Sequence, residues 1–267
     1  MFDELEALPH TERSIHMIVG HLLRVAGRSD GESVKVTLDK SCDGVHYAEE
    51  YLKCYPDLLF LNVVRDPRAQ VASMNDAIIH EFSTLNNIEV WLKAYKEMDN
   101  LMAKYPDKVV TIRFEDFISD QAATLKKVCE FMGIEYSDDL CDIKKSAEGK
   151  EMSQLSPLWT SNFSHPMKLV IDKYKKKLSY YDVEMIETLC GEYMDKYGYE
   201  KFTLAQSVVS DEDRAKAVEA SQTNKEKAWD VLQNNCEFDK DFELRKIRSN
   251  FLQSSRDKLA SRNAQGA

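Results

Sequence analysis

Residues 58–74 read LLFLNVVRDPRAQVASM, and this stretch decides the fold. Leu58–Val64 is apolar except for Asn62, which is typical of a short strand buried on both faces of a parallel sheet. Asp66 can accept hydrogen bonds as the N-cap of a helix, and Pro67 suits the first helical position. The stretch therefore predicts a strand, a short turn and a helix. Such a unit places an anion-binding site at the carboxyl end of the strand.

Two side chains of this unit are candidate anion ligands. Arg65 lies where the strand should end, and its planar guanidinium is suited to phosphate. Ser73 lies eight residues later and carries a hydroxyl. That spacing is about two helical turns. We expect both side chains to face one solvent-accessible pocket. The alternative interpretation is that Arg65 pairs with a carboxylate such as Asp66 and that Ser73 only packs.

The segment VVRDPRAQVASM resembles the 3′-phosphate-binding segment of the sulfotransferase family. That family uses the donor 3′-phosphoadenosine 5′-phosphosulfate (PAPS). Its pattern is an apolar strand, then Arg-Asp/Asn-Pro-Arg, then a Ser eight residues after the first Arg. The resemblance implies that Arg65 and Ser73 bind the 3′-phosphate of PAPS or of its product, 3′-phosphoadenosine 5′-phosphate (PAP). It also implies sulfuryl transfer to a hydroxyl or amine acceptor without a metal, and it leaves the acceptor open.

Residues 109–134 resemble a second signature of the same family. The signature is a strand, a Phe-Glu-Asp-Phe turn at residues 114–117, and a helix that ends in Phe-Met-Gly. Adjacent residues of a strand point to opposite sides, so Glu115 and Asp116 are poorly placed to act as an acid–base pair. We therefore prefer a structural role for both carboxylates.

A third, partial match concerns Lys40. Residues 39–42 read DKSC, whereas many carbohydrate-type sulfotransferases have Lys-Ser/Thr-Pro at this point. The resemblance implies that Lys40 binds substrate, near the transferring group or the acceptor, and the alternative is a solvated lysine. The general base is left unassigned. His10, His16 and Glu6 are candidates because relatives often place their base in the early segment.

Short apolar runs alternate with helical stripes, which predicts an α/β fold. We expect a small parallel sheet flanked by helices, as in the P-loop-like sulfotransferase fold, with strands at 34–38, 58–64 and 109–113. Helices are expected at 11–26, 45–54, 69–77, 87–105, 120–132 and 181–197, and a loop at 138–163. Residues 1–202 would form this sulfotransferase-like domain. Residues 203–267 would form a charged, helical and separable C-terminal extension, a surface that could receive a protein partner.

One part of the family pattern is not found in the sequence. The fold normally begins with a strand and a Gly/Ser/Thr-rich loop that wraps the 5′-phosphosulfate of the donor. Upstream of Lys40 there is neither GxxxxGK[ST] nor GxGxxG. We therefore expect weak PAP binding and impaired sulfate transfer by this chain. The alternative function is a non-catalytic binding or scaffold protein that retains the sulfotransferase fold.

The amino-acid composition argues against several other classes of function. The 36 basic and 46 acidic side chains give a net charge of −10, which argues against binding a nucleic-acid polymer but not a nucleotide. No apolar run is long enough to span a membrane. The six cysteines have no metal-binding spacing, and HExxH is absent. The sequence favours the cytoplasm for this chain as given, and the Golgi lumen if a longer precursor exists.

Overall fold

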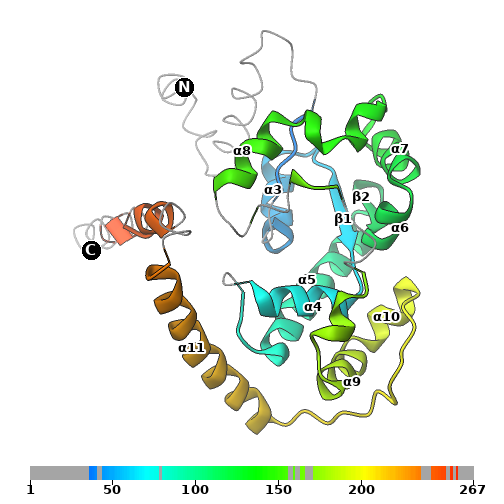
Figure 1. The fold of residues 1–267 in the computed structure, drawn as a ribbon. Coiled ribbons are helices and arrows are strands. Elements are labelled where there is room, and N and C mark those ends of the chain that lie inside the picture. Colours follow the sequence, from blue (N-terminus) through cyan, green and yellow to red (C-terminus); the bar gives the residue numbers. More distant parts are fainter. Residues whose placement is uncertain are drawn as a thin grey trace, which may run out of the picture. The chain divides into compact units, whose positions relative to one another are not determined.

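The structure is a computed structural model that describes residues 36–40, 44–77, 80–155, 159, 163–165, 171–235, 242–250, 253–254 and 257. It is mostly helical, with one small sheet (Figure 1). The elements in chain order are η2 (Gly44–Tyr47), α3 (Ala48–Cys54), β1 (Phe60–Val64), α4 (Pro67–Asp76), α5 (Thr84–Lys104), η3 (Pro106–Lys108), β2 (Val109–Arg113), α6 (Phe114–Ser119), α7 (Gln121–Met132), η4 (Asp138–Cys141), η5 (Ile143–Lys145), α8 (Ala147–Leu155), η8 (Lys173–Lys176), α9 (Tyr180–Leu189), α10 (Gly191–Tyr197) and α11 (Asp211–Gln233). Residues 242–250 are also helical.

Strands β1 and β2 form a two-stranded parallel sheet in the part of the chain that the structure describes. The Asn62 amide donates to the Thr111 hydroxyl at 3.2 Å, and the backbone N–H of Asp66 donates to Glu115 at 3.0 Å. Both pairs are separated by 49 residues, and a constant separation means that the two segments run in the same direction. The predicted strands at 58–64 and 109–113 and the α/β class are confirmed.

The predicted strand at 34–38 is wrong over its described part. Residues 36–40 have no regular structure, and the side chains of Val36 and Leu38 are 46% and 65% exposed. Alternating apolar residues favour a strand only when a neighbouring strand pairs with it and one face is covered. The expectation that β1 is buried on both faces is also wrong, because Val63 is 48% exposed whereas Val64 is fully buried.

The helix boundaries follow local capping signals. Asp66 caps α4 by accepting from the backbone N–H of Arg68 at 2.9 Å, with Pro67 in the first position. Asp120 caps α7 in the same way, and Ser179 forms a capping box at the start of α9. Gly133 ends α7 with a left-handed φ of 65°, which suits glycine. The helices predicted from these signals are confirmed within a few residues.

One predicted helix and one predicted loop need correction, and another predicted helix cannot be compared with the structure. The helix predicted at 181–197 is divided at Cys190 into α9 and α10. The loop predicted at 138–163 contains η4, η5 and the helix α8. Short polar segments of this kind lack a strong apolar stripe, so the periodicity of the sequence does not reveal them. The helix predicted at 11–26 lies outside the described residues.

The described residues fall into two compact units. One comprises the residues up to Asn62 together with Lys93–Thr111, and in it α3 and α5 share a core of Ala48, Leu52 and Leu101. The other comprises Val63–Leu92 and the residues from Ile112 onward. In this second unit α4 packs against η8 and α9, and its core includes Ala69, Ala72 and Tyr174.

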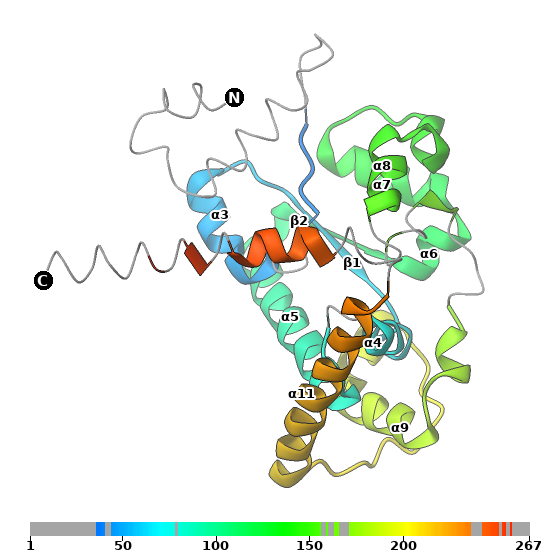
Figure 2. The same cartoon turned by 60° about the vertical axis from the view of Figure 1, so that its left-hand side comes forward.

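The described part of the C-terminal extension is helical over α11 and residues 242–250, and the first half of α11 is anchored within the second unit. Figure 2 shows α11 as one continuous helix after the extended segment that follows α10. The Ser221 hydroxyl, on α11, donates to Glu81 at 2.7 Å and accepts from the backbone N–H of Phe82 at 2.9 Å. Arg214 forms an ion pair with Glu89. The proposed domain boundary at residue 202 stays a prediction.

Within the described ranges no helix combines the length and the apolar composition that crossing a membrane requires.

Candidate functional site

Arg65 lies directly after β1, at the carboxyl end of the sheet. Its side chain is half-buried, and its guanidinium carbon lies 4.7 Å from the centre of the Phe114 ring, which follows β2. Burial lowers the pKa of Arg65, and the nearby carboxylates of Glu115 and Asp66 oppose that shift. An arginine remains protonated at neutral pH even so. A partly desolvated fixed positive charge therefore lies where the sequence predicts an anion ligand.

Ser73 lies on α4 and is exposed. The buried positions of this helix are Pro67, Arg68, Ala69, Val71, Ala72 and Met74. Ser73 is thus kept out of the core, and its hydroxyl is open to solvent, as a ligand-binding hydroxyl must be. Arg65 and Ser73 belong to the same compact unit. Their joint contact with one phosphate stays a prediction.

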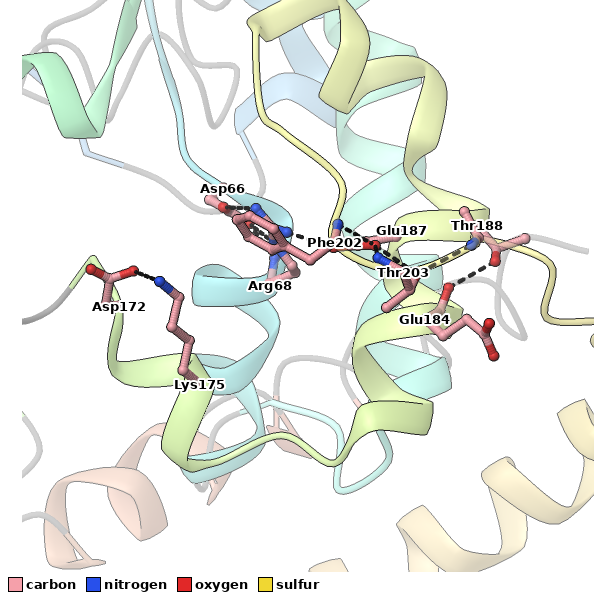
Figure 3. A network of polar contacts seen from close by, with 10 residues as sticks. Asp66, Arg68, Asp172, Lys175, Glu184, Glu187, Thr188, Phe202 and Thr203 are labelled. Carbon is pink, nitrogen blue, oxygen red and sulfur yellow. Dashed lines mark hydrogen bonds and ion pairs between the residues drawn. The ribbon is translucent and has the colours of Figure 1, made fainter.

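The second arginine of the Arg-Asp-Pro-Arg stretch, Arg68, was not singled out in the sequence but has a defined role in the structure (Figure 3). Its Nε donates to one carboxylate oxygen of Asp66 at 3.0 Å, and its terminal nitrogen donates to the other at 2.7 Å. Asp66 therefore uses both oxygens on Arg68 while also capping α4. This two-point pair is the strongest geometry available to an arginine and a carboxylate.

Glu187, on α9, completes a buried charge cluster with Asp66 and Arg68. Its side chain is fully buried and accepts from Arg68 at 2.5 Å, across 119 residues of sequence. It also accepts from the backbone N–H of Phe202 at 3.0 Å, and from the backbone N–H and hydroxyl of Thr203 at 2.7 and 2.6 Å. Burial would raise the pKa of Glu187, but these hydrogen bonds outweigh burial and lower it.

Two aromatic rings cover the Arg68 guanidinium. The centre of the Tyr174 ring lies 5.0 Å from its central carbon, and that of Phe202 lies 4.6 Å away. Burial alone would lower the pKa of Arg68, but the hydrogen bond and the charge of Asp66 outweigh it, so the pKa is raised. The sequence holds no signal for Glu187 or Phe202, because their contacts depend on how α9 packs against α4.

Glu115 connects the two strand ends. One carboxylate oxygen accepts from the backbone N–H of Asp66 at 3.0 Å, and the other accepts from the Tyr199 hydroxyl at 2.8 Å. Burial, and next the charge of Glu115, raise the pKa of Tyr199, so this hydroxyl stays protonated and donates. Arg113 lies over the Tyr199 ring at 4.7 Å. These contacts fit the structural role preferred for Glu115. The predicted turn around it is the short helix α6.

The structure defines the surroundings of the other candidate site residues less closely. Lys40 is exposed in residues 36–40 and belongs to the first unit, so its contact with substrate stays a prediction. His10, His16 and Glu6 lie outside the described residues. In the first unit the structure also pairs His46 with Glu97 through a hydrogen bond that the sequence did not suggest. The described residues contain no group of side chains able to hold a metal ion.

Comparison with known proteins agrees with this arrangement. The model of the sulfotransferase family matches residues 6–138, which include both strands and α4. Among solved structures, the sulfotransferase domain from the curacin biosynthetic pathway has a similar fold, with a TM-score of 0.52 and 16% sequence identity. The match covers 74% of this chain and 77% of that domain. No curated protein matches. At this identity, the structural match shows the fold alone.

Proposed function

Because the chain belongs to the sulfotransferase family, we propose that it transfers a sulfuryl group from PAPS to a hydroxyl or amine acceptor. Arg65 holds the 3′-phosphate of the donor. Ser73, which lies about two turns into α4, donates its hydroxyl to the same phosphate. The observation that carries this proposal is the position of Arg65, which follows β1 directly and precedes the capped start of α4.

The proposed binding is electrostatic and local. The net charge of −10 repels an anionic nucleotide at long range, so affinity has to come from groups near the phosphate. Arg65 supplies a permanent positive charge, and its partial burial strengthens the attraction by lowering the local dielectric constant. A charge-assisted hydrogen bond of this kind contributes about 1.5–3 kcal/mol.

The transfer itself would be in line. The acceptor oxygen or nitrogen attacks sulfur while the bond between sulfur and the bridging oxygen of the 5′-phosphate breaks, and PAP leaves with that electron pair. A general base removes the acceptor proton. Positive groups near the leaving phosphate would stabilise its developing charge. The base and the acceptor are not assigned to any described residue.

We further propose that residues 1–267 bind PAP weakly. The basis is the sequence upstream of Lys40, which has no recognisable Gly/Ser/Thr-rich phosphosulfate loop. Losing two or three charge-assisted hydrogen bonds from the 5′ half of a donor site costs about 3–6 kcal/mol, or about two to four decades in affinity. The 3′ half, through Arg65 and Ser73, would supply the remaining affinity.

Calorimetry with PAP tests the 3′-phosphate site. Arg65→Ala should weaken PAP binding by about 10- to 100-fold, because one charge-assisted interaction is lost. The matched control is Arg248→Ala, which removes the same charge from an exposed position in the helical segment 242–250 and should leave affinity unchanged. Equal affinities of the unchanged protein and Arg65→Ala would contradict the proposal. A radiolabelled-sulfate assay on the same proteins reports transfer.

A further inference from the structure

We propose that a cluster formed by Asp66, Arg68, Glu187, Phe202 and Thr203, whose three charged members are buried, positions Arg65 for the 3′-phosphate, an inference that rests on the proposed function. This positioning cluster does not itself touch the nucleotide. It holds the turn between β1 and α4, on which Arg65 lies, in one conformation.

Hydrogen bonds to Asp66, the residue next to Arg65, hold the turn between β1 and α4. The carboxylate of Asp66 accepts two bonds from the Arg68 guanidinium and one from the Arg68 backbone N–H. Its own backbone N–H donates to Glu115. That N–H belongs to the peptide bond that joins Arg65 to Asp66. The backbone that carries the Arg65 side chain is therefore tied to Glu115, on α6, on one side and to the cluster on the other.

Burial makes the geometry of the cluster unique. Arg68 is 2% exposed and Glu187 is fully buried, so a rotation of either side chain would leave a charge unpaired away from water. The cost of such a state is large, so the paired arrangement is strongly favoured. Two carboxylates share one guanidinium, and the backbone N–H groups of Phe202 and Thr203 supply the further donors that Glu187 needs.

The cluster makes the proposed donor site depend on residues that lie far from Arg65 in the sequence. The family match ends at residue 138, whereas Glu187, Phe202 and Thr203 lie beyond it. Figure 3 shows the Phe202 ring over the Arg68 guanidinium, with Thr203 beside Glu187. Phe202 is 61% exposed although the centre of its ring lies 4.6 Å from the central carbon of the buried Arg68 guanidinium. The segment after α10 is thus a structural requirement of a phosphate site that lies 137 residues earlier, counting from Arg65 to Phe202.

A purely structural role would have different consequences. If the cluster only stabilised the fold, its loss would weaken all ligands of this domain alike or none of them. If it positions Arg65, its loss should weaken only ligands that carry the phosphate bound by Arg65. The contrast between PAP and adenosine 5′-monophosphate, which lacks the 3′-phosphate, separates these two roles.

The test is a double-mutant cycle read by calorimetry. Glu187→Gln removes one charge from the cluster and keeps the size of the side chain. It should weaken PAP binding by about 5- to 30-fold and change the affinity for adenosine 5′-monophosphate by less than about twofold. In the Arg65→Ala background, Glu187→Gln should have no further effect on PAP, because coupled residues are not additive. Glu184→Gln is the matched control, since Glu184 lies one turn earlier on α9, bonds to Ser207 and does not contact Arg68.

Thr203→Val provides a second, milder variant, because it removes one hydroxyl donor to Glu187 and leaves the Arg68 ion pair in place. We expect it to weaken PAP binding in the same selective way by about two- to fivefold, with the native circular dichroism spectrum retained. Equal losses for both nucleotides, or additive losses in the cycle, would overturn the positioning role while leaving Arg65 as a ligand. If Arg65→Ala itself has no effect on PAP, the proposed function fails first.

Discussion

Arg65 and Arg68 carry the same side chain three residues apart, yet their surroundings give them different roles. Arg65 is half-buried at the end of β1, beside the Phe114 ring. Arg68 is buried, paired with two carboxylates and covered by two aromatic rings. A guanidinium that already donates to carboxylates from all three of its nitrogens is a poor ligand for an added phosphate. This difference supports the proposal that Arg65 binds the anion and that Arg68 positions its turn.

We expect Glu187→Gln to lower the free energy of unfolding by about 3–5 kcal/mol at neutral pH. Removing one partner of a buried ion pair is costly because the other partner is left unpaired. Urea unfolding measures this loss. Glu184→Gln, on the same helix, should lower the unfolding free energy by less than about 1 kcal/mol. Similar losses for the two variants would contradict the energetic importance of the cluster.

The pH dependence of stability gives an independent check on Glu187. Its pKa in the folded state is lowered below the ordinary value of 4.5. The stability it contributes is therefore fully present above pH 4.5 and is lost as the pH falls through the lowered value. Glu187→Gln should flatten this acidic part of the stability profile. A profile with unchanged slope below pH 4.5 would show that Glu187 does not titrate as this environment requires.

The two halves of helix α11 have different surroundings. Its first half contains Arg214 and Ser221, which bind residues of the loop and helix that follow α4. The described side chains of its second half are exposed except near Trp229, as shown by Val231 at 67% exposure. Further upstream, Ser207 bonds to Glu184 and Thr188 of α9. The contacts of the extension with the second unit are thus concentrated between residues 202 and 224.

Two truncations test this difference within the extension. Removing residues 225–267 should change the unfolding free energy by less than about 1 kcal/mol, because most of the described side chains in this range are exposed. Removing residues 205–267 also deletes Ser207 and Ser221. It removes the hydroxyl that accepts from the part-buried N–H of Phe82, a hydrogen bond that contributes about 0.5–1.5 kcal/mol net, together with the other contacts of α11. Chemical denaturation of both proteins gives the values. Equal stability of the two would support a fully separable extension.

For the whole molecule, the negative net charge and the proposed phosphate site act in opposite directions. The charge of −10 would work against the approach of PAP, while in the proposed site Arg65 and the start of α4 would attract its 3′-phosphate locally. Ligand binding to the folded state should still raise the stability of the whole chain, because the unfolded chain does not hold Arg65 and Ser73 together.

At about 100 times its dissociation constant, PAP should stabilise the folded protein by about 2.7 kcal/mol. For a chain of this size that corresponds to a rise of about 5–10 °C in the melting temperature. Differential scanning fluorimetry measures the shift. At the same PAP concentration Arg65→Ala should show a much smaller rise. A full-sized shift in that variant would mean that PAP binds elsewhere.

Several features of this fold could be predicted from residues that are close in sequence. The apolar run before Arg65, the Asp-Pro cap of α4, the capping residues Asp120 and Ser179 and the glycine that ends α7 each act within a few residues. Such local interactions set the ends of helices in almost any tertiary context. The sequence therefore determined the strand–turn–helix unit and the place of Arg65 at its turn.

Other features were decided only by the tertiary structure. The side chain of Arg68 meets Glu187 across 119 residues, and nothing in the local sequence of either residue selects the other. The alternating residues Val36 and Leu38 read as a strand but lie exposed without one, because a strand requires a partner for its backbone hydrogen bonds. Contacts between distant segments depend on how helices pack, and a local sequence pattern carries no information about that packing. The sequence alone thus located the proposed phosphate ligand, and the packing of α9 and residues 202–203 against α4 formed the cluster that holds its turn.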